Sequence, residues 1–307
     1  MKPLLLAFAD QRGPASALAA ALDAETATIG RHRFPDRESL VRVDGDCRGR
    51  EVVVFCSLRD PDDLALPLLF AARTAREFGA RRVGLVAPYL AYMRQDARFH
   101  PGEAISCVHY AAFLSWTFDW LVSVDPHLHR HAGLGEVYAI PTRCVSAAAP
   151  IAQWIGANVA HPLLVGPDEE SGQWVGAAAA RLGAPFVVLR KNRRGDRDVE
   201  VSLPDPALLA GRTPVLLDDI AASGHTLIEA VRGLRRLGGA KPVCVVVHGL
   251  FADAADRALL DAGAARVVST DAVPHATNAI GLAAELVPAI RPMLARCRSD
   301  RFPPPPP

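Results

Sequence analysis

The segment at residues 214–226 constrains the fold more than any other part of this 307-residue chain. An apolar run at residues 215–217 leads directly into two adjacent carboxylates, Asp218 and Asp219, and then into a loop of small residues. Apolar residues at helical spacing follow over residues 226–237. The segment therefore predicts a buried strand, a tight loop and the N-terminus of a helix.

A turn of this kind is suited to binding a phosphate. Unpaired backbone N–H groups and the positive end of the helix dipole meet at the start of the helix. Asp218 and Asp219, just before the loop, are placed to hold sugar hydroxyls, directly or through a metal ion. The structural alternative is an ordinary strand-to-helix turn with an aspartate near the N-cap. The order of acid pair, small loop, Gly-x-Thr and helix favours a binding site.

Composition narrows the class of protein. Hydrophobic residues make up 50% of the chain and charged residues 22%, as in soluble globular proteins. The formal net charge of +1 gives no overall field for nucleic acid or an anionic membrane. The six cysteines form no Cys-x-x-Cys pair, which argues against a zinc site and a disulfide framework. No segment has the pattern of a signal peptide or the ~18 apolar residues of a membrane span, so we expect a cytoplasmic protein.

Predicted strands and helices alternate in two similar halves. The strand at residues 51–57, with the turn at 59–63 and the next helix, resembles the segment at 214–226 in the second half. This internal similarity indicates a duplication, and the turn at 59–63 is then its degenerate copy. Alternating strands and helices predict an α/β fold with mostly parallel sheets flanked by helices on both faces. Binding sites are expected beyond the carboxyl ends of the strands.

We divide the chain into an N-terminal domain at 1–145, a C-terminal domain at 146–290 and a tail at 291–307. The helix predicted at residues 286–294 is expected to dock back onto the first half. A polyproline run at 301–307 ends the chain and is expected to be extended, without a role in chemistry.

Two polar loops follow predicted strands of the first half. Arg94, Gln95 and Asp96 offer a guanidinium, an amide and a carboxylate, which suit the phosphates and base of a nucleotide; the alternative is a solvated turn. The second loop begins at Asp125, and three histidines alternate along it in a pattern compatible with metal binding: His127, His129 and His131. A lone histidine is more often structural, so a carboxylate partner is needed to support a metal ligand.

The second half supplies two more loops. Asp168 lies in an acidic turn with Glu169 and Glu170, which suits magnesium or, alternatively, the N-terminus of a helix. Lys191 and Arg193 lie in a predicted basic loop, one of whose uses is to cover transferred phosphates. Most basic runs are only solvated, but lysine occurs at just three positions in this chain, which indicates that a compact charge is needed here.

Taken in order, these motifs resemble those of ribose-phosphate pyrophosphokinases, from Phe34 to about Ile290. The matching segments are Phe34 to Glu38, Arg94 to Asp96, Asp125 to His127, Gly166 to Asp168, Lys191 to Arg193 and Asp218 to Thr226. The resemblance implies two tandem type I phosphoribosyltransferase-type domains. It also implies a magnesium-dependent reaction in nucleotide biosynthesis, in which ATP donates its β,γ-diphosphate to O1 of ribose 5-phosphate and AMP is released.

The resemblance also implies roles for single residues. Lys191 and Arg193 stabilise the transferring diphosphate, and His127 and Asp168 bind the magnesium. The ATP contacts are Phe34, Asp36 and Glu38 from a neighbouring subunit together with Arg94, Gln95 and Asp96, so a homo-oligomer is expected. The ribose 5-phosphate contacts are Asp218, Asp219, Ala222, Ser223, Gly224, His225 and Thr226.

Three positions depart from the family pattern. Ala222 replaces an acidic residue, His225 replaces a glycine, and Glu169 with Glu170 follows Asp168 where small residues are usual. Three other functions therefore stay open. They are a catalytically weak regulatory homologue, a base-salvage phosphoribosyltransferase, and a pyrophosphokinase that acts on another phosphorylated sugar.

Overall fold

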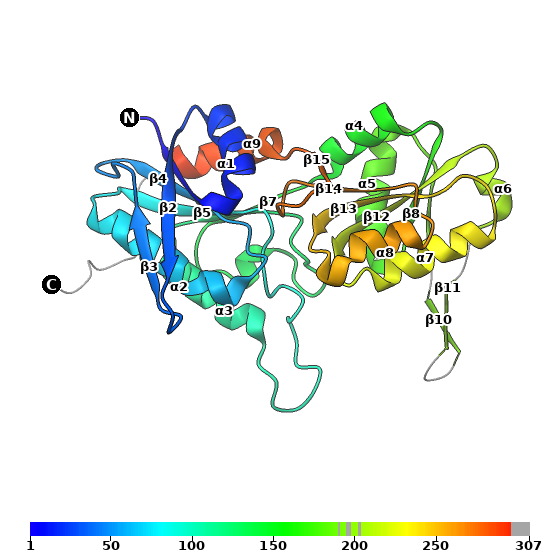
Figure 1. Cartoon of the computed structure of the whole chain (residues 1–307), viewed down its shortest axis with the longest axis horizontal. Helices are drawn as coiled ribbons and strands as arrows, with labels where there is room; N and C mark the ends of the chain where they lie inside the picture. Colours follow the sequence, from blue (N-terminus) through cyan, green and yellow to red (C-terminus); the bar gives the residue numbers. More distant parts are fainter. Residues whose placement is uncertain (190, 195–197, 202–203, 296–307) are drawn as a thin grey trace.

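The structure is a computed structural model that describes residues 1–189, 191–194, 198–201 and 204–295; for 191–194 and 198–201 it describes the backbone. The polyproline run at 301–307 lies outside these residues. Two sheets lie side by side, one from each half of the chain (Figure 1). None of the described helices is long and apolar enough to cross a membrane.

The first sheet has seven strands in the order β3-β2-β1-β4-β5-β6-β7. All neighbours are parallel except β2 and β3, which form an antiparallel hairpin at the edge. The strands are β1 (Leu4–Phe8), β2 (Glu25–Arg33), β3 (Ser39–Val43), β4 (Glu51–Phe55), β5 (Arg82–Ala87), β6 (Leu121–Val124) and β7 (Thr142–Val145).

The second sheet has six parallel strands in the order β15-β14-β13-β12-β8-β9. They are β8 (Pro162–Gly166), β9 (Phe186–Val188), β12 (Thr213–Ala221), β13 (Val243–Gly249), β14 (Arg266–Thr270) and β15 (Asn278–Ile280). Their order repeats that of β2-β1-β4-β5-β6-β7, with β9 corresponding to β2 and β12 to β4. The α/β fold of two mostly parallel sheets is confirmed, and the turn at residues 59–63 occupies the place equivalent to the predicted phosphate-binding turn.

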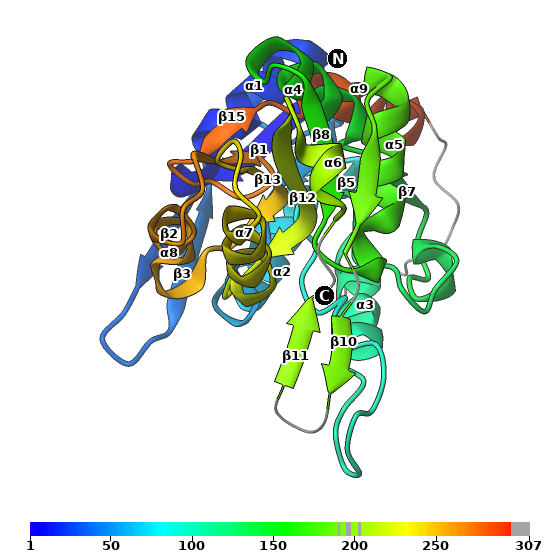
Figure 2. The ribbon, with the colours of Figure 1, turned by 90° about the vertical axis from the view of Figure 1, so that its right-hand side faces the viewer.

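A hairpin, β10 (Lys191–Arg194) and β11 (Asp198–Val201), stands where the first half has β3. The two strands pair antiparallel, with Lys191 opposite Val201 and Arg193 opposite Val199 (Figure 2). The sequence predicted a loop at residues 190–197, and this prediction is wrong for the backbone at Lys191–Arg194. The many charges obscured a strand whose partner carries β-branched valines at alternate positions.

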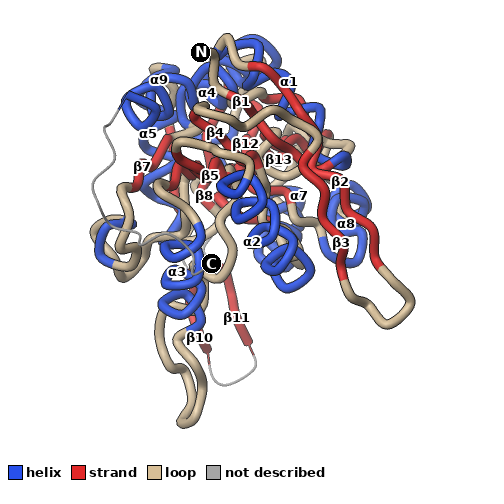
Figure 3. The backbone as a smooth tube through the Cα atoms, turned by 90° about the vertical axis from the view of Figure 1, so that its left-hand side faces the viewer, coloured by secondary structure: helices blue, strands red, loops and turns tan. Residues whose placement is uncertain are grey.

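Helices cover both faces of each sheet, as the tube drawing in Figure 3 shows for the first half. One continuous apolar core joins the two halves and contains the inner residues of α1, α4, α5 and α9. Separate cores lie on the opposite faces, under α2 and α3 in the first half and α7 and α8 in the second. The helices are α1 (Arg12–Leu22), α2 (Pro61–Glu77), α3 (Ser106–Thr117), α4 (Ala148–Asn158), α5 (Gly172–Leu182), α6 (Pro206–Leu209), α7 (His225–Arg236), α8 (Ala255–Asp261) and α9 (Ala283–Ala295).

Side chains alternate between these cores along each strand. In β1, Leu5 and Ala7 point into the core shared by the two halves, whereas Leu4, Leu6 and Phe8 point into the core under α2. All five residues are buried, as expected for a parallel strand covered on both faces.

The helix that follows the last strand of each sheet packs against a helix of the other sheet. Helix α4 follows β7 of the first sheet and packs on α5, whereas α9 follows β15 of the second sheet and packs on α1 (Figure 1). The prediction that the C-terminal helix returns to the first half is therefore confirmed. This exchange fixes the two sheets relative to each other.

Arg82 attaches α9 to the first sheet. Its Nη2 donates to the carbonyl oxygens of Met293, at 2.7 Å, and Leu294, at 2.9 Å, and lies 3.0 Å from Oε2 of Glu51. The Arg82 side chain is only 7% exposed. Burial raises the pKa of Glu51, and the hydrogen bond and charge of Arg82 oppose that rise.

We expect Arg82→Met to lower the free energy of unfolding by about 2–4 kcal/mol, because it leaves two helix-terminal carbonyls and the Glu51 carboxylate without their cation. Urea unfolding measures the change. The matched control is Arg81→Met, whose side chain is 59% exposed and lies 3.7 Å from Glu51, with an expected loss below about 1 kcal/mol. Equal losses in the two variants would contradict the role assigned to Arg82.

Candidate active site

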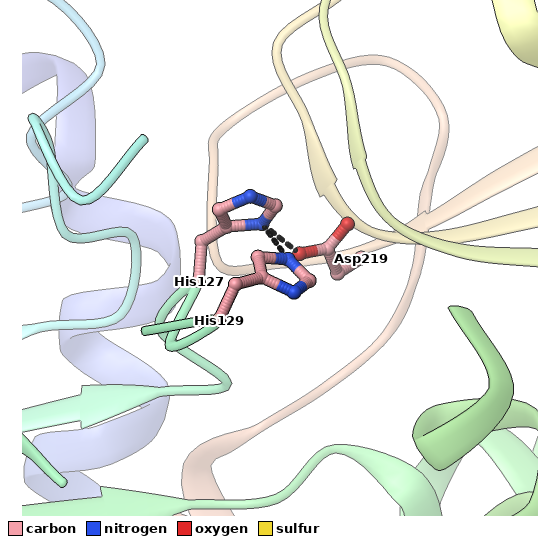
Figure 4. A group of neighbouring side chains, drawn as sticks. All are labelled: His127, His129 and Asp219. Carbon is pink, nitrogen blue, oxygen red and sulfur yellow. Dashed lines mark hydrogen bonds and ion pairs between the residues drawn. The ribbon is translucent and has the colours of Figure 1, made fainter. Parts of the chain in front are cut away.

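Loops from the two halves meet beyond the carboxyl ends of the strands. Nδ1 of His127, in the loop after β6, lies 2.7 Å from Oδ2 of Asp219, near the end of β12 (Figure 4). The strand β12 runs past its apolar run to Ala221, so both aspartates extend from a strand rather than from a loop. The structure thus joins a predicted metal ligand of the first half to a predicted sugar ligand of the second.

Of the three alternating histidines, two join this contact. Nε2 of His129 lies 3.0 Å from Nδ1 of His127, and the two rings stack edge to face at 3.8 Å. His131 turns away, with Nδ1 placed 3.4 Å from Glu136. Period-two spacing in a loop does not decide which side chains converge, so the sequence singled out His127 but not His129.

The Asp219 carboxylate is charged although it is buried. Burial opposes its ionisation, but the hydrogen bond and charge of His127 outweigh burial and hold the pKa of Asp219 below its usual value. The neighbouring Asp218 accepts a hydrogen bond from the backbone N–H of Asp219 at 3.0 Å and is partly exposed. An ionised pair at this position can accept hydrogen bonds from two sugar hydroxyls.

Two buried groups that the sequence did not select stand behind the cluster. Burial raises the pKa of Asp125 to about 6, although the backbone N–H of Ala147 donates to its carboxylate at 2.7 Å. Burial lowers the pKa of His248 to about 4, so this imidazole is neutral and its Nε2 donates to the Asp125 carbonyl at 3.2 Å. Nδ1 of His248 has no hydrogen-bond partner among the described residues. The sequence placed Asp125 at the start of the histidine motif without a role of its own and gave His248 no role, because the burial of both comes from strand packing.

The predicted phosphate loop lies between β12 and α7. Gly224 has φ = 69°, and a Cβ there would lie 3.3 Å from Ala255, so the turn requires glycine. The carbonyl oxygen of Ala222 accepts a hydrogen bond from Ala252 N at 3.0 Å, which attaches the loop to the segment after β13. Ser223 and His225 are exposed, and Thr226 is partly buried in the first turn of the helix. The predicted strand, loop and helix start are therefore present.

The acidic turn adopts the alternative that the sequence left open. Asp168 is the N-cap of a short 3-10 helix, η3 (Glu169–Ser171), and its carboxylate accepts from Ser171 N at 3.3 Å. Glu170 of the same turn lies 3.7 Å from Nε2 of His129. The predicted pairing of Asp168 with His127 around a metal ion stays a prediction, whereas the turn itself borders the histidine cluster.

The nucleotide motif lies beside the same region. The buried phenol of Tyr89 has a raised pKa, chiefly through burial; the Arg94 charge opposes the rise and that of Asp219 adds to it. The charges of Arg94 and Asp219 therefore both affect the pKa of Tyr89. Asp96 is nearly buried and pairs with Arg130 at 2.6 Å, and Gln95 is exposed.

The remaining predicted residues lie on two hairpins. Phe34, Asp36 and Glu38 form the exposed tip between β2 and β3, which projects from the edge of the first sheet (Figure 1). The tip is closed by the Phe34 N–H donating to the Glu38 carbonyl at 2.9 Å and by the Glu38 N–H donating to the Asp36 carboxylate. The side chains of Lys191 and Arg193 lie outside those that the structure describes.

The possible ligand atoms of this cluster favour some metal ions over others. Two imidazole nitrogens and one carboxylate oxygen face one another, with His127, His129 and Asp219 all offering atoms within 4.8 Å. Magnesium favours oxygen ligands in octahedral geometry and keeps several waters. This trio therefore does not fit magnesium held by the protein alone.

A cavity of about 290 Å³ opens beside the cluster. Its wall includes His129, Glu170, Asp125 and Trp174. The cavity places solvent-accessible space on the side of the cluster that faces α5.

Comparisons with known proteins cover nearly the whole chain. A profile of the N-terminal domain of ribose phosphate pyrophosphokinase matches residues 4–117, and one of the phosphoribosyl transferase domain matches residues 134–285. A ribose-phosphate pyrophosphokinase of Methanopyrus kandleri is 33% identical over 89% of this chain and 93% of its own. One from Halobacterium salinarum is 30% identical over 94% of this chain and 100% of its own.

A solved structure agrees with these relatives. The crystal structure of phosphoribosylpyrophosphate synthetase from Mycobacterium smegmatis superposes with a TM-score of 0.82 at 25% identity, covering 95% of this chain and 99% of that one. The superposition, the two matching profiles and relatives of this identity support one conclusion. The chain belongs to the ribose-phosphate pyrophosphokinase family.

Proposed function

We propose that this protein transfers the β,γ-diphosphate of ATP to O1 of ribose 5-phosphate. The observation that carries the proposal is the contact of His127 with Asp219, which joins the two halves beside the phosphate loop. A base-salvage phosphoribosyltransferase needs only one such domain. Here the second half carries the sugar-binding pattern and the first half contributes side chains to the same place.

The sugar is held by the second half in this proposal. Asp218 and Asp219 accept hydrogen bonds from the ribose hydroxyls. The ionised carboxylate of Asp219 is a stronger acceptor than a protonated carboxyl group would be. The 5-phosphate lies on the loop from Ala222 to Thr226, where backbone N–H groups and the start of α7 favour an anion. Ser223 and Thr226 add hydroxyl donors, and exposed His225 adds an imidazole that relatives with glycine lack.

At phosphorus, the reaction breaks one P–O bond and forms another. O1 of the sugar attacks the β-phosphorus of ATP and gives its proton to water, and the bond from that phosphorus to the oxygen shared with the α-phosphorus breaks, so AMP leaves with the electron pair of that bond. Such transfers depend on positioning and on neutralising charge. We assign this neutralisation to Lys191 and Arg193 on the β10–β11 hairpin, and contacts with ATP to Arg94, Gln95 and Asp96.

Magnesium enters as part of the substrate, the magnesium complex of ATP, whose phosphates supply oxygen ligands. His127 and Asp168 are the predicted protein contacts of this ion. The adenine contacts, Phe34, Asp36 and Glu38, lie on an exposed hairpin, which supports their use by a neighbouring subunit in a homo-oligomer.

The purified protein is expected to release AMP and form 5-phosphoribosyl 1-diphosphate from ATP, magnesium and ribose 5-phosphate. Coupled AMP detection and phosphorus NMR of the product measure this. A panel of other phosphorylated sugars tests the effect of Ala222 and His225 on sugar choice. A folded protein that releases no AMP with any sugar would refute the proposal and favour a regulatory homologue.

Lys191→Ala is expected to lower kcat about 100–1,000-fold with little change in ATP binding, because the lysine acts on charge that develops during transfer. The control is Lys241→Ala, the same substitution at an exposed lysine before β13, with activity unchanged. Steady-state kinetics and nucleotide binding separate the effects. Equal losses in turnover and in ATP binding would mean that Lys191 contributes to binding and not specifically to the transfer step.

A shared ATP site predicts complementation between variants. Chains carrying Phe34→Ala and chains carrying Lys191→Ala, each of low activity alone, are expected to regain part of the activity when co-expressed with different tags and purified as mixed oligomers. Mixed oligomers of differently tagged Lys191→Ala chains serve as the control. Activity no greater than the sum of the separate variants would mean that each chain builds its own site.

A further inference from the structure

The cluster at the centre of the site has the geometry of a metal-binding trio. Nδ1 of His127 lies 2.7 Å from Oδ2 of Asp219 and 3.0 Å from Nε2 of His129, so three ligand atoms from two halves of the chain face one point (Figure 4). The His127, His129 and Asp219 side chains are 17%, 24% and 8% exposed. Asp219 closes the trio on its buried side, and His129, which is exposed as a residue, forms its open side.

Hydrogen bonding alone does not satisfy this arrangement. Nδ1 of His127 is the shared partner of both other atoms, and an imidazole nitrogen carries at most one proton. A protonated Nδ1 donates to the Asp219 carboxylate and leaves Nε2 of His129 without its bond, whereas an unprotonated Nδ1 accepts from His129 and leaves the carboxylate without a donor. A divalent cation placed between the three atoms would accept a lone pair from each of them.

The donor types decide which ions fit. Imidazole nitrogen suits zinc, iron, cobalt and related first-row ions, whereas magnesium is served by carboxylates, carbonyls and water. Four ligands at 2.0–2.1 Å from a tetrahedral zinc lie about 3.3 Å apart. To reach that separation, Nδ1 of His127 has to move about 0.6 Å from Oδ2 of Asp219 and about 0.3 Å from Nε2 of His129, and all three atoms already lie within 4.8 Å of one another.

The surroundings supply an outer shell and open coordination positions. Glu170 carries a carboxylate oxygen 3.7 Å from Nε2 of His129, and the ring of Trp174 lies edge to face with His129 at 6.0 Å. The cavity of about 290 Å³ beside His129 leaves space for water or a substrate oxygen to complete the coordination.

We propose that His127, His129 and Asp219 bind a divalent transition-metal ion, of the manganese, cobalt or zinc class, in the absence of nucleotide. The ion's place beside the ribose-binding aspartate rests on the proposed function, whereas its binding does not require substrates. Magnesium arrives with ATP, held mainly by phosphate oxygens, and has His127 as a predicted contact too, so the transition-metal site belongs to the nucleotide-free protein. His129 adds a second imidazole nitrogen, so the trio offers two nitrogen ligands and one oxygen ligand.

The test is metal binding by protein freed of metal with EDTA and assayed without ATP or sugar. Calorimetry is expected to give one tight site per chain for cobalt, manganese and zinc, and much weaker binding of magnesium. Cobalt is expected to develop visible d–d bands and to quench the fluorescence of Trp174, with less quenching in Trp174→Phe. Magnesium binding as tight as that of cobalt would overturn the proposal.

His129→Gln removes the ligand that distinguishes this site and is expected to weaken cobalt binding by at least about 10–100-fold, the loss typical of outer-shell changes alone. His131→Gln is the matched control, since it makes the same change two residues later in the side chain that lies beside Glu136. Equal affinities in the two variants would refute the assignment. Thermal unfolding in EDTA verifies that both variants fold.

A measurement on the unaltered chain makes the test independent of any variant. Pulsed electron paramagnetic resonance of the manganese-loaded protein is expected to show coupling to imidazole nitrogen. Bound manganese without nitrogen coupling would exclude the trio. Because these experiments contain no substrate, their failure leaves the transferase proposal standing, and a lack of AMP formation leaves metal binding standing.

Discussion

The packing of α4 and α9 on opposite halves holds the two sheets in the arrangement on which the site depends. Each sheet carries its strand ends at one edge because its strands are parallel, but those edges need a fixed relation before side chains from both can meet. The shared apolar core and the attachment of α9 through Arg82 supply that relation. The contact between His127 and Asp219 follows from it.

The duplicated fold separates two tasks that a single domain would combine. In the second half, β12 ends with two aspartates, and the turn after it has a glycine with positive φ and an exposed helix start. The equivalent turn after β4, at residues 59–63, does not have this pattern, and the histidine loop of the first half lies against β12. The two halves therefore contribute different side chains to one place.

Charged groups within the site are stabilised by their immediate neighbours rather than by an excess of opposite charge over the whole protein. The net charge is only +1, yet Asp219 stays ionised in a buried position because His127 lies against it. Asp125, with no cation so close, has a pKa raised to about 6 by burial. Two carboxylates near one imidazole cluster thus have pKa values shifted in opposite directions through burial and contact, a pattern common at sites that bind charged ligands.

The sequence by itself determined the sheet-forming runs, the duplication and the order of the motifs, because buried parallel strands such as β4 and β12 are continuous apolar segments with a recognisable end. The strand β2 and the edge strands β7 and β15 were missed, since half-exposed or short strands lack that pattern. Only the tertiary structure decided that His127 and His129 meet Asp219, that His131 meets Glu136 and that Asp168 caps a helix. Loop side chains have no periodicity, and their partners lie up to 92 positions away in the chain. The packing of the two halves therefore determines which of these side chains meet.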